Sequence, residues 1–598
     1  MIEKIKPYWG GLLAILAMGL KTILFYHLIE VDTNRTWVIL VTWSYLALGY
    51  AILPKKRYAK SGFYWFCSIL MFADVIYFKY FNQILSVRLL SQTGQLGTVT
   101  DVIFLLITPK ELLLVGDCLL ILGLKKFNKL HLPSIPVAYK SFGIGVLAFF
   151  IGLVGFNVLG IKDLRGISHQ EFYTYHLLDV ADVVKAEANE GDVKDRIEAK
   201  NIPAMPKDAY YGLGKDKNLI VIQVESLQDM VIQKDYEGQE LTPHLNQLIA
   251  DQSLYFNNYY QQLGKGNTSD AEFVTQNSLY ASMKGQSYVL FQDNQFYGLP
   301  WITRDYGYST MVMHGYKKAF WNREKAYPNQ GFQQFIGEED FKLDETIGFG
   351  LTDESFFKQA VPYLKSQKSP FYSFMITLTS HTPFKMPADK QKLKLKPSDE
   401  GTYFGDYLQS VHYTDMAIGK FIEDLKKEGL YDNTVIAIYG DHFGISSKKE
   451  DVWQNVTDFI GRPYDFDEMM NIPLIIHVPG MEKAKTIETT GGQIDFLPTI
   501  LHLMGMELKT PYVFGKDLLV EKSGFVASQT YMVEGSFLAK EVVLEMSRDT
   551  VYENSRAWNR QTGKKLDPQA YRRYYERAKK EITESNYILE NNMIENQR

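Results

Sequence analysis

The pattern of hydrophobic positions divides the chain into two parts at about residue 160. Long apolar runs dominate before this point. After about residue 218, short runs rich in β-branched residues alternate with amphipathic stretches. A run of about 20 apolar residues is long enough to cross a bilayer as a helix, whereas strand–helix alternation is typical of a soluble α/β domain. The pattern therefore predicts a transmembrane part followed by a soluble part.

Five apolar runs in the first part approach the length of a membrane span. The fourth is the weakest, because Pro109, Lys110 and Glu111 interrupt it. The alternative, a bundle of buried helices in a soluble protein, is disfavoured by the asymmetric distribution of basic residues between the runs. We expect residues 1–160 to form a transmembrane domain with these five spans: about 8–29, 36–53, 63–82, 101–123 and 142–160.

The basic residues between the runs predict the orientation of this domain, since cytoplasmic loops carry more Lys and Arg than outer loops. One set of loops is strongly basic and contains Lys4, Lys6, Lys55, Lys56, Arg57, Lys60, Lys125, Lys126, Lys129 and Lys140. The alternate loops contain Arg35 and Arg88 and little else that is basic. The N-terminus is therefore expected in the cytoplasm. With an odd number of spans, everything after about residue 160 is expected outside the cell.

Residues 161–217 are expected to form an extracellular helical linker, with a helical pattern over residues 170–188. The triplet Ala186-Glu187-Ala188 has the small-x-small form of a signal-peptidase site, although such triplets are common by chance. Release after Ala188 is therefore an alternative to a permanently anchored protein.

The soluble part is predicted to be an α/β domain over residues 218–535. Amphipathic patterns separate its apolar runs, for example over residues 404–429, where Gly429 is suited to end a helix. This alternation predicts a mostly parallel central sheet with helices on both faces. Residues 536–598 are charged and are expected to form a helical C-terminal segment, with the helix after Asp567. The runs predicted as buried strands are 218–226, 309–314, 371–380, 433–441 and 471–480.

Charge and cysteine content narrow the class of protein. The net charge is −5 and the chain has no long basic stripe, which disfavours nucleic acid as a partner. The two cysteines, Cys67 and Cys118, both lie in apolar runs. The soluble part therefore has neither a disulfide framework nor a thiolate metal site.

Chemically active side chains follow four of the predicted strands. They are Glu225, His314, His381, Asp441 and His442. One such residue alone is most often a cap or a surface residue. Ligands of α/β proteins bind at the carboxyl ends of the strands, however, and a cluster of this composition is typical of a metal or anion site. The mixture of ligand types suits Mn²⁺, Mg²⁺ or Zn²⁺ and does not decide among them.

The stretch 264-GKGNTSDAEF-273 admits two interpretations. Ser269 and Glu272 have the spacing of a capping box, which predicts the start of a helix. Thr268 would then lie at a helix N-terminus, where negative charge is favoured and a hydroxyl can become a nucleophile.

A second stretch, 314-HGYKKAFWNRE-324, also has two interpretations. Arg323 could make a forked bond to a phosphate or carboxylate, and Trp321 could cover a small polyol. Alternatively, Trp321 fills the core and Arg323 is paired at the surface.

Together these motifs resemble those of the lipoteichoic acid synthases, the polyglycerol-phosphate polymerases of Gram-positive bacteria. That family belongs to the sulfatase-like branch of the alkaline phosphatase superfamily. The resemblance covers nearly the whole chain, including the layout of five spans and an extracellular sulfatase-like domain. The matching motifs are VES at 224–226, GNTSDAEF at 266–273, HGYKKAFWNRE at 314–324, TSHTPF at 379–384 and YGDHFGIS at 439–446.

The resemblance implies a transferase that moves sn-glycerol-1-phosphate units from phosphatidylglycerol to a lipid-anchored polyglycerolphosphate chain. The reaction would pass through a glycerophospho-threonine intermediate and release diacylglycerol. It implies one Mn²⁺ per site, with Mg²⁺ as the alternative. The implied partners are the phosphatidylglycerol donor, a glycolipid-anchored acceptor, the cell membrane, and the cell-wall or division machinery.

The resemblance also assigns roles to residues. The implied metal ligands are Glu225, Thr268, Asp441 and His442. The implied catalytic residues are Thr268, as the nucleophile, and His381. The implied substrate-binding residues are His314, Trp321, Arg323, His381 and Ser446.

Three rival functions remain at this stage. A primase, or another head-group transferase or hydrolase, would keep the fold and change the acceptor. A non-catalytic membrane receptor or scaffold would have a degenerate site, which the intact metal positions argue against. Sulfate ester hydrolysis is disfavoured, because the Cys/Ser-x-Pro-x-Arg pattern of classical sulfatases is replaced here by Thr-Ser-Asp-Ala-Glu at 268–272.

Overall fold

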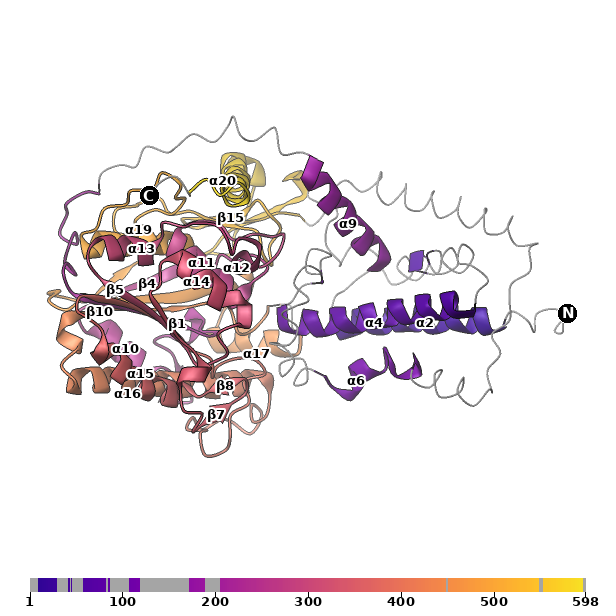
Figure 1. The fold of residues 1–598 in the computed structure, drawn as a ribbon, viewed down its shortest axis with the longest axis horizontal. Helices are drawn as coiled ribbons and strands as arrows, with labels where there is room; N and C mark the ends of the chain where they lie inside the picture. The colour runs from indigo at the N-terminus through magenta and orange to yellow at the C-terminus, as the bar shows by residue number, and fades with distance from the viewer. Residues whose placement is uncertain are drawn as a thin grey trace. The chain divides into compact units, whose positions relative to one another are not determined.

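The chain forms two compact units in the computed structural model (Figure 1). One comprises residues 1–190 and 547–554, and the other comprises residues 191–546 and 555–598. The structure describes residues 9–29, 41, 42, 45, 57–81, 84, 85, 107–118, 172–188, 205–447, 450–547 and 552–594.

The first unit is helical where it is described. Its helices are α2 (Trp9–Leu28), α4 (Arg57–Phe81), α6 (Pro109–Leu112) and α9 (Phe172–Ala188). Helices α2 and α4 pack side by side, and their core includes Met18, Phe25 and Met71. The ring of Phe172, at the start of α9, lies 4.9 Å from that of Phe25. The helical pattern of the linker therefore corresponds to α9, which ends at Ala188.

Two of the five predicted spans correspond to helices among the described residues. The runs 8–29 and 63–82 correspond to α2 and α4. Among the described residues, one segment, Gly62–Lys79, is long and apolar enough to cross a membrane, and Leu16–Leu28 is a shorter apolar helix. The run 142–160 lies outside the described residues, as do most of 36–53 and both ends of 101–123.

The second unit is built on a mixed central sheet. Its strands are β1 (Asn218–Val224), β4 (Ser253–Tyr260), β5 (Ser309–His314), β6 (Gln334–Ile336), β9 (Phe371–Ile376), β10 (Thr434–Gly440), β11 (Asn471–His477), β12 (Lys485–Ile487) and β13 (Gly491–Gly492). The strand order is β12-β4-β11-β10-β1-β9-β5-β6, with β13 paired to β4. Every residue of β1 is buried, as expected for a central strand covered on both faces.

The direction of one strand differs from the prediction. Strand β11, from the run 471–480, is antiparallel to both neighbours, β10 and β4. The other pairings described in this sheet are parallel. The apolar pattern of a buried strand does not encode its direction, so the sequence could predict the strand but not its orientation.

Helices cover both faces of the sheet (Figure 1). Helices α10 (Pro243–Ala250), α15 (Asp353–Ser366) and α16 (Tyr403–Lys427) cover one face. Helices α11 (Asn267–Asn277), α13 (Leu299–Asp305), α14 (Arg323–Gln330) and α19 (Phe496–Met504) cover the other. Gly429 follows α16 with φ of +70°, the left-handed conformation expected of a glycine that ends a helix. The shorter elements are α12 (Ser287–Leu290), α17 (Glu450–Ile460), α18 (Phe466–Met470), and the hairpins β2 (Asp235–Tyr236) with β3 (Gln239–Glu240) and β7 (Thr346–Ile347) with β8 (Gly350–Leu351).

The C-terminal segment, residues 536–598, has a helix after Asp567, where the sequence predicts one, and strands in its first half, which the sequence does not predict. This region contributes four strands to a second, antiparallel sheet before its helix begins. The sheet contains β14 (Val526–Ser528), β15 (Ser536–Ala539), β16 (Val542–Glu545), β17 (Arg556–Asn559) and β18 (Lys565–Leu566). Helix α20 (Arg572–Glu590) follows and packs on β14 and β15. The strands are two to four residues long, too short for their alternation to stand out among charged neighbours.

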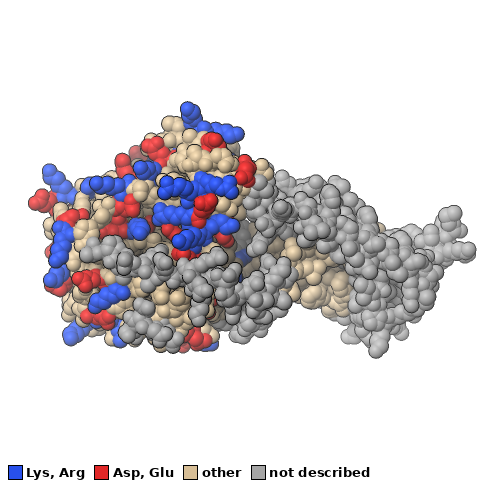
Figure 2. All heavy atoms as spheres, turned by 90° about the horizontal axis from the view of Figure 1, so that it is seen from above, with Lys and Arg blue, Asp and Glu red and all other residues tan. Residues whose placement is uncertain are grey.

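The surface of the second unit carries charges of both signs. On the face that Figure 2 shows, Lys and Arg side chains are interspersed with Asp and Glu side chains. Such mixing is typical of a soluble domain surface.

Candidate active site

The topology brings the polar residues predicted at strand ends to one edge of the central sheet. Strands β5, β9, β1 and β10 are consecutive neighbours and run parallel, so their carboxyl ends lie together. His314 ends β5, Glu225 directly follows β1, and Asp441 and His442 directly follow β10. His381 lies five residues beyond the end of β9. The site forms where ligands bind in sheets of this kind.

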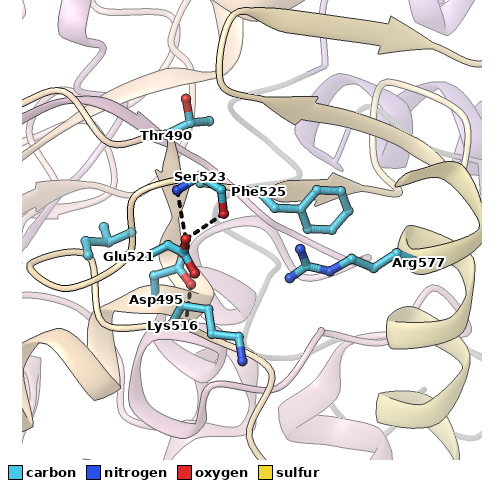
Figure 3. A pocket seen from close by; sticks show the side chains of 9 residues that line it. Thr490, Asp495, Lys516, Glu521, Ser523, Phe525 and Arg577 are labelled. Carbon is cyan, nitrogen blue, oxygen red and sulfur yellow. Dashed lines mark hydrogen bonds between the residues drawn. The ribbon is translucent and has the colours of Figure 1, made fainter. Parts of the chain in front are cut away.

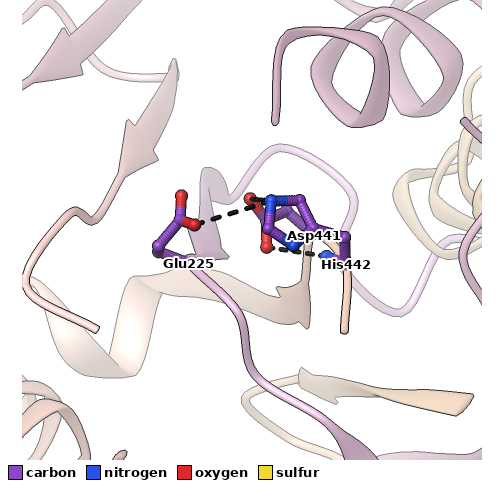
Figure 4. Close-up of side chains that lie close together, drawn as sticks. All are labelled: Glu225, Asp441 and His442. Carbon is purple, nitrogen blue, oxygen red and sulfur yellow. Dashed lines mark hydrogen bonds and ion pairs between the residues drawn. The ribbon is translucent and has the colours of Figure 1, made fainter. Parts of the chain in front are cut away.

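Glu225, Asp441 and His442 form a compact cluster (Figure 4). The Nε2 atom of His442 lies 3.5 Å from Oε1 of Glu225 and 3.4 Å from Oδ2 of Asp441. One potential ligand atom from each residue lies within 4.8 Å of the others. The Oγ1 atom of Thr268 lies 3.4 Å from Oε2 of Glu225 and 3.5 Å from Nε2 of His442. All four predicted metal ligands therefore meet at one point.

The cluster fits a divalent cation. Asp441 is fully buried, and its Oδ2 atom has no hydrogen-bond partner among the residues that the structure describes. Its Oδ1 atom accepts hydrogen bonds from the backbone N–H groups of Ser226, at 2.8 Å, and His442, at 2.6 Å. The Nδ1–H group of His442 donates to the carbonyl oxygen of Phe443, at 3.0 Å, which leaves Nε2 as the ligand atom. A buried carboxylate oxygen without a partner is costly unless a cation binds it.

Burial and the charges within the cluster shift the pKa values of its three residues. Burial raises the pKa of Glu225, and burial together with the charge of Glu225 raises the pKa of Asp441 to about 7. Burial alone would lower the pKa of His442, but the carboxylates of Asp441 and Glu225 raise it above its ordinary value. The raised pKa values mean that a metal ion would compete with protons for these three groups.

Thr268 lies at the start of α11, but a capping box does not hold this helix end. The helix begins at Asn267, and the Oγ atom of Ser269 donates to the carbonyl oxygen of Gly266, at 2.9 Å. Glu272 pairs with Arg323 instead of reaching back to the helix start. The side chain that accepts a bond from the N–H group of Gly266, at 2.6 Å, belongs to Asp270. The helix start was thus predicted in the right place for the wrong reason.

The carbonyl oxygen of Thr268 is tied to the central sheet. It accepts a hydrogen bond from Nε2 of Gln223, on β1, at 3.1 Å. The Oε1 atom of Gln223 accepts from the hydroxyl of Tyr439, on β10, at 2.9 Å. The hydroxyls of Tyr439 and Thr275 lie 2.9 Å apart. These buried bonds fix α11, and with it the Thr268 side chain, over the strands that carry the metal ligands.

The turn before α14 carries two predicted substrate-binding residues. Trp321 and Asn322 both have φ of 59°, a conformation that is uncommon for residues other than glycine and often found at functional sites. Trp321 is 5 % exposed and Arg323 is 1 % exposed. Arg323 is therefore not paired at the surface, and that alternative from the sequence is wrong. Its partner is the buried carboxylate of Glu272, at 2.5 Å from Nη2.

The histidines on either side of the site are both neutral at pH 7. The Nδ1–H group of His314 donates to the carbonyl oxygen of Ile376, at 3.1 Å, and burial followed by the charge of Arg323 lowers its pKa. The Nδ1–H group of His381 donates to the carbonyl oxygen of Thr382, at 2.7 Å, and burial lowers its pKa to about 4. Each imidazole therefore presents Nε2 as an acceptor.

Ser446 lies in the loop after β10, four residues beyond His442, and is partly buried. The structure thus brings the four metal positions into contact. Sequence reasoning missed Gln223 and Glu272 as site residues. Gln223 had a signal, a polar side chain within the buried run LIVIQV, whereas Glu272 was assigned to a capping box.

A separate pocket lies beside α20 (Figure 3). The Oε1 atom of Glu521 accepts hydrogen bonds from the backbone N–H group of Ser523, at 2.8 Å, and from its hydroxyl, at 2.5 Å. The guanidinium of Arg577 lies 3.9 Å from the centre of the Phe525 ring. None of the predicted site residues lines this pocket. Its contacts connect α20 to the loop before the second sheet.

Comparison with known proteins first defines the class. Residues 217–506 match the sequence model of the family described as Sulfatase. The structure of a protein in the alkaline phosphatase superfamily from Vibrio parahaemolyticus covers 69 % of this chain and 95 % of that chain, with a TM-score of 0.54 and 20 % identity. The sheet, the strand-end cluster and the family match define a sulfatase-like domain, and the likeness to the Vibrio parahaemolyticus structure shows the same fold.

Closer relatives then define the family. Residues 2–166 match the lipoteichoic acid synthase N-terminal domain. Lipoteichoic acid synthase 2 of Bacillus subtilis is 31 % identical over 85 % of this chain and 83 % of its own length. Lipoteichoic acid synthase of Staphylococcus aureus is 32 % identical over 86 % and 84 %. The structure of the lipoteichoic acid synthase LtaP from Listeria monocytogenes covers 68 % of this chain and 98 % of its own, with a TM-score of 0.61 and 29 % identity. The chain belongs to the lipoteichoic acid synthase family.

Proposed function

We propose that this protein transfers sn-glycerol-1-phosphate units from phosphatidylglycerol to a lipid-anchored polyglycerolphosphate chain and thereby builds the lipoteichoic acid backbone. The observation that carries the proposal is the position of Thr268 Oγ1, 3.4 Å from Glu225 and 3.5 Å from His442 in a buried cluster suited to a cation. A hydroxyl so placed is suited to attack a phosphodiester, and the family relationship supports lipoteichoic acid synthesis as the process.

In the first half of the reaction, Thr268 Oγ1 attacks the phosphorus of phosphatidylglycerol. The bond from phosphorus to the diacylglycerol oxygen breaks, and glycerophosphate stays on Thr268. The proton that Thr268 loses ends on diacylglycerol, because His381 protonates the leaving oxygen. Glu225, Asp441 and His442 would hold the cation, with Thr268 as the fourth ligand. When bound, a divalent cation lowers the pKa of a neighbouring hydroxyl and offsets the charge on phosphoryl oxygens.

In the second half, the terminal glycerol hydroxyl of the acceptor chain attacks the same phosphorus and releases Thr268. His381 is suited to take the proton of this hydroxyl, because its pKa of about 4 keeps the imidazole neutral at pH 7. His314, Trp321, Arg323 and Ser446 would bind the glycerophosphate. Arg323 is a permanent cation and suits the phosphoryl oxygens.

The lipid donor requires the site to be held near the outer leaflet. We propose that five spans within residues 1–160 anchor the protein, with the N-terminus in the cytoplasm, a linker over 161–217 and the catalytic domain over 218–535 outside the cell. The cation is Mn²⁺, with Mg²⁺ as the alternative. Release after Ala188 by signal peptidase would separate the catalytic domain from this anchor.

The test uses the full-length protein in detergent with a fluorescent phosphatidylglycerol. We expect diacylglycerol release that stops on chelation and returns with Mn²⁺ or Mg²⁺. Mass spectrometry of the intact protein should find a glycerophosphate adduct on Thr268. Thr268→Ala should lose the adduct and reduce turnover to background while the protein still folds. Ser269→Ala, which removes the neighbouring hydroxyl, should retain the adduct. Undiminished turnover in Thr268→Ala would contradict the nucleophile assignment.

Products formed with a glycolipid acceptor separate this function from its rivals. A polymerase gives chains of many units, a primase adds one unit, and a hydrolase releases free glycerophosphate. A receptor or scaffold releases no diacylglycerol.

A further inference from the structure

Glu272 and Arg323 form a buried ion pair of forked geometry. Both Nε and Nη2 of Arg323 donate to Oε1 of Glu272, at 3.1 and 2.5 Å, and Nε also lies 3.3 Å from Oε2. The Arg323 and Glu272 side chains are 1 % and 0 % exposed. A buried ion pair is weak evidence for a stabilising role, because desolvation offsets much of the attraction. A reason other than stability is therefore needed for this pair.

A third side chain completes the arrangement. The hydroxyl of Tyr327, one turn after Arg323 on α14, donates to Oε2 of Glu272 at 2.7 Å. Both carboxylate oxygens are thus occupied, and the guanidinium is held along one edge. Its remaining nitrogen, Nη1, is buried and has no hydrogen-bond partner among the residues that the structure describes. A buried N–H group of a cation without an acceptor is costly, which indicates that an anionic ligand completes it.

The position of Glu272 on α11 connects this arrangement to the nucleophile. Thr268 and Glu272 are four residues apart, so they lie on the same side of the helix, one turn from each other. The helix itself is tied to the sheet through Gln223 and Tyr439. One rigid element therefore sets the distance between the attacking oxygen and the carboxylate that holds the guanidinium.

We propose that Glu272 is a positioning residue for glycerophosphate transfer: it holds Arg323 so that Nη1 meets the phosphoryl oxygen of the substrate, at a distance from Thr268 that α11 sets. The inference rests on the proposed function for the identity of the phosphoryl group. Tyr327 fixes the second oxygen of Glu272 and supports the same orientation.

The test compares the full-length wild type with Glu272→Gln, Arg323→Ala and the double variant. Glu272→Gln retains the volume of the side chain and removes its charge. We expect it to lower kcat for diacylglycerol release on the order of 10- to 100-fold, the range for losing charge-assisted hydrogen bonds. We expect no further loss when Glu272→Gln is added to Arg323→Ala, because Glu272 acts through Arg323.

Chemical rescue gives a readout that a merely structural role would not change. Guanidinium chloride at millimolar, non-denaturing concentration should restore part of the activity of Arg323→Ala, because Glu272 anchors the added cation in the vacated space. The same salt should not rescue the double variant. Equal rescue of both proteins, or a loss in the double variant equal to the product of the single losses, overturns the proposal.

Two further variants keep the test decisive: one replaces Glu272→Gln if that protein does not fold, and the other is a control for the loss of a buried carboxylate. Tyr327→Phe removes one hydrogen bond to Glu272 and should lower kcat about 3- to 10-fold. If Glu272→Gln does not fold, unchanged kcat in Tyr327→Phe overturns the proposal. Asp415→Asn is the matched control: it also removes a buried carboxylate, one that accepts hydrogen bonds from the N–H groups of His244 and Leu245, and it should leave kcat unchanged.

Binding of sn-glycerol 1-phosphate, measured by calorimetry on the same proteins, separates this inference from the proposed function. If the wild type transfers nothing but Glu272→Gln weakens binding only when Arg323 is present, the proposed function fails and the positioning role stands. If transfer proceeds and the two substitutions act independently on both binding and kcat, the positioning role fails and the proposed function stands.

Discussion

The protonation of His381 is the residue-scale feature with the most direct kinetic consequence. Its ring is partly buried against Phe349, whose ring centre lies 4.5 Å away. Since burial disfavours the charged imidazole, the pKa falls to about 4. The neutral form therefore prevails at pH 7, and His381 can accept a proton, as the proposed second half of the reaction requires.

We expect the second half of the reaction to show no inflection from His381 between pH 5 and 8. Protonation removes the base, so the rate should decline as the pH falls toward 4. The measurement is a single-turnover pH profile of adduct decay on Thr268 in the presence of acceptor. His381→Gln should slow this decay on the order of 10²- to 10⁴-fold. A profile with a midpoint near the ordinary histidine value of about 6.5 would contradict the assigned protonation state.

Much of the site at this scale could be predicted from the sequence. Glu225, Asp441 and His442 directly follow apolar runs, and the edge of a parallel sheet is where such residues meet. The role of Glu272 could not be predicted, because its partner lies 51 residues away and its spacing from Ser269 suits a local cap equally well. A local pattern does not reveal which of two partners a buried carboxylate takes.

At the scale of elements, the position of helix α11 is determined by its hydrogen bonds to the sheet more than by its own sequence. All of its residues are buried, and a polar chain links it to β1 and β10 through Gln223 and Tyr439. The sequence of α11 predicts a helix start but gives no amphipathic face by which to place the helix on the sheet. The direction of β11 and the short strands β15 to β18 could not be predicted from local patterns either, because pairing with distant segments determines them.

We expect Gln223→Leu to leave the Thr268 carbonyl without its Gln223 donor and to remove the Gln223 acceptor of the Tyr439 hydroxyl, which keeps only Thr275. The free energy of unfolding should fall by about 1–3 kcal/mol. Transfer should fall about 10-fold beyond what the loss of folded protein explains, because small displacements of a nucleophile are costly. Urea unfolding and diacylglycerol release measure the two effects. The control is Gln276→Leu, which removes an acceptor for Tyr372 at 2.8 Å farther along α11. Equal loss of transfer in both variants would contradict the positioning role of Gln223.

At the scale of the whole molecule, the chain joins a unit matched to the lipoteichoic acid synthase N-terminal domain with a sulfatase-like unit. The boundary between the two parts could be predicted from hydropathy alone, because long apolar runs dominate the first part and short ones the second. Cysteine use follows the same division. Both cysteines, Cys67 and Cys118, are buried in the first unit, and the second has none.

This distribution allows a direct test of topology. In a background with Cys67 and Cys118 changed to serine, we expect Ser398→Cys, at an exposed position of the catalytic unit, to react with a membrane-impermeant maleimide in intact cells. Lys56→Cys, in one of the basic loops, should react only after the cells are opened. Labelling of Lys56→Cys in intact cells, or protection of Ser398→Cys, would contradict the proposed orientation.

The burial of Thr268 affects how much phospholipid is lost to hydrolysis during polymer synthesis. Its side chain is 8 % exposed, so a glycerophosphate group attached to it would lie in a site with little room for solvent. Every adduct that water removes would cost the cell one phospholipid head group without lengthening a polymer. A nucleophile recessed in this way favours attack by an acceptor that brings its own binding contacts over attack by water. The depth of one threonine thus bears on how many phospholipids the bacterium consumes for each unit of polymer on its surface.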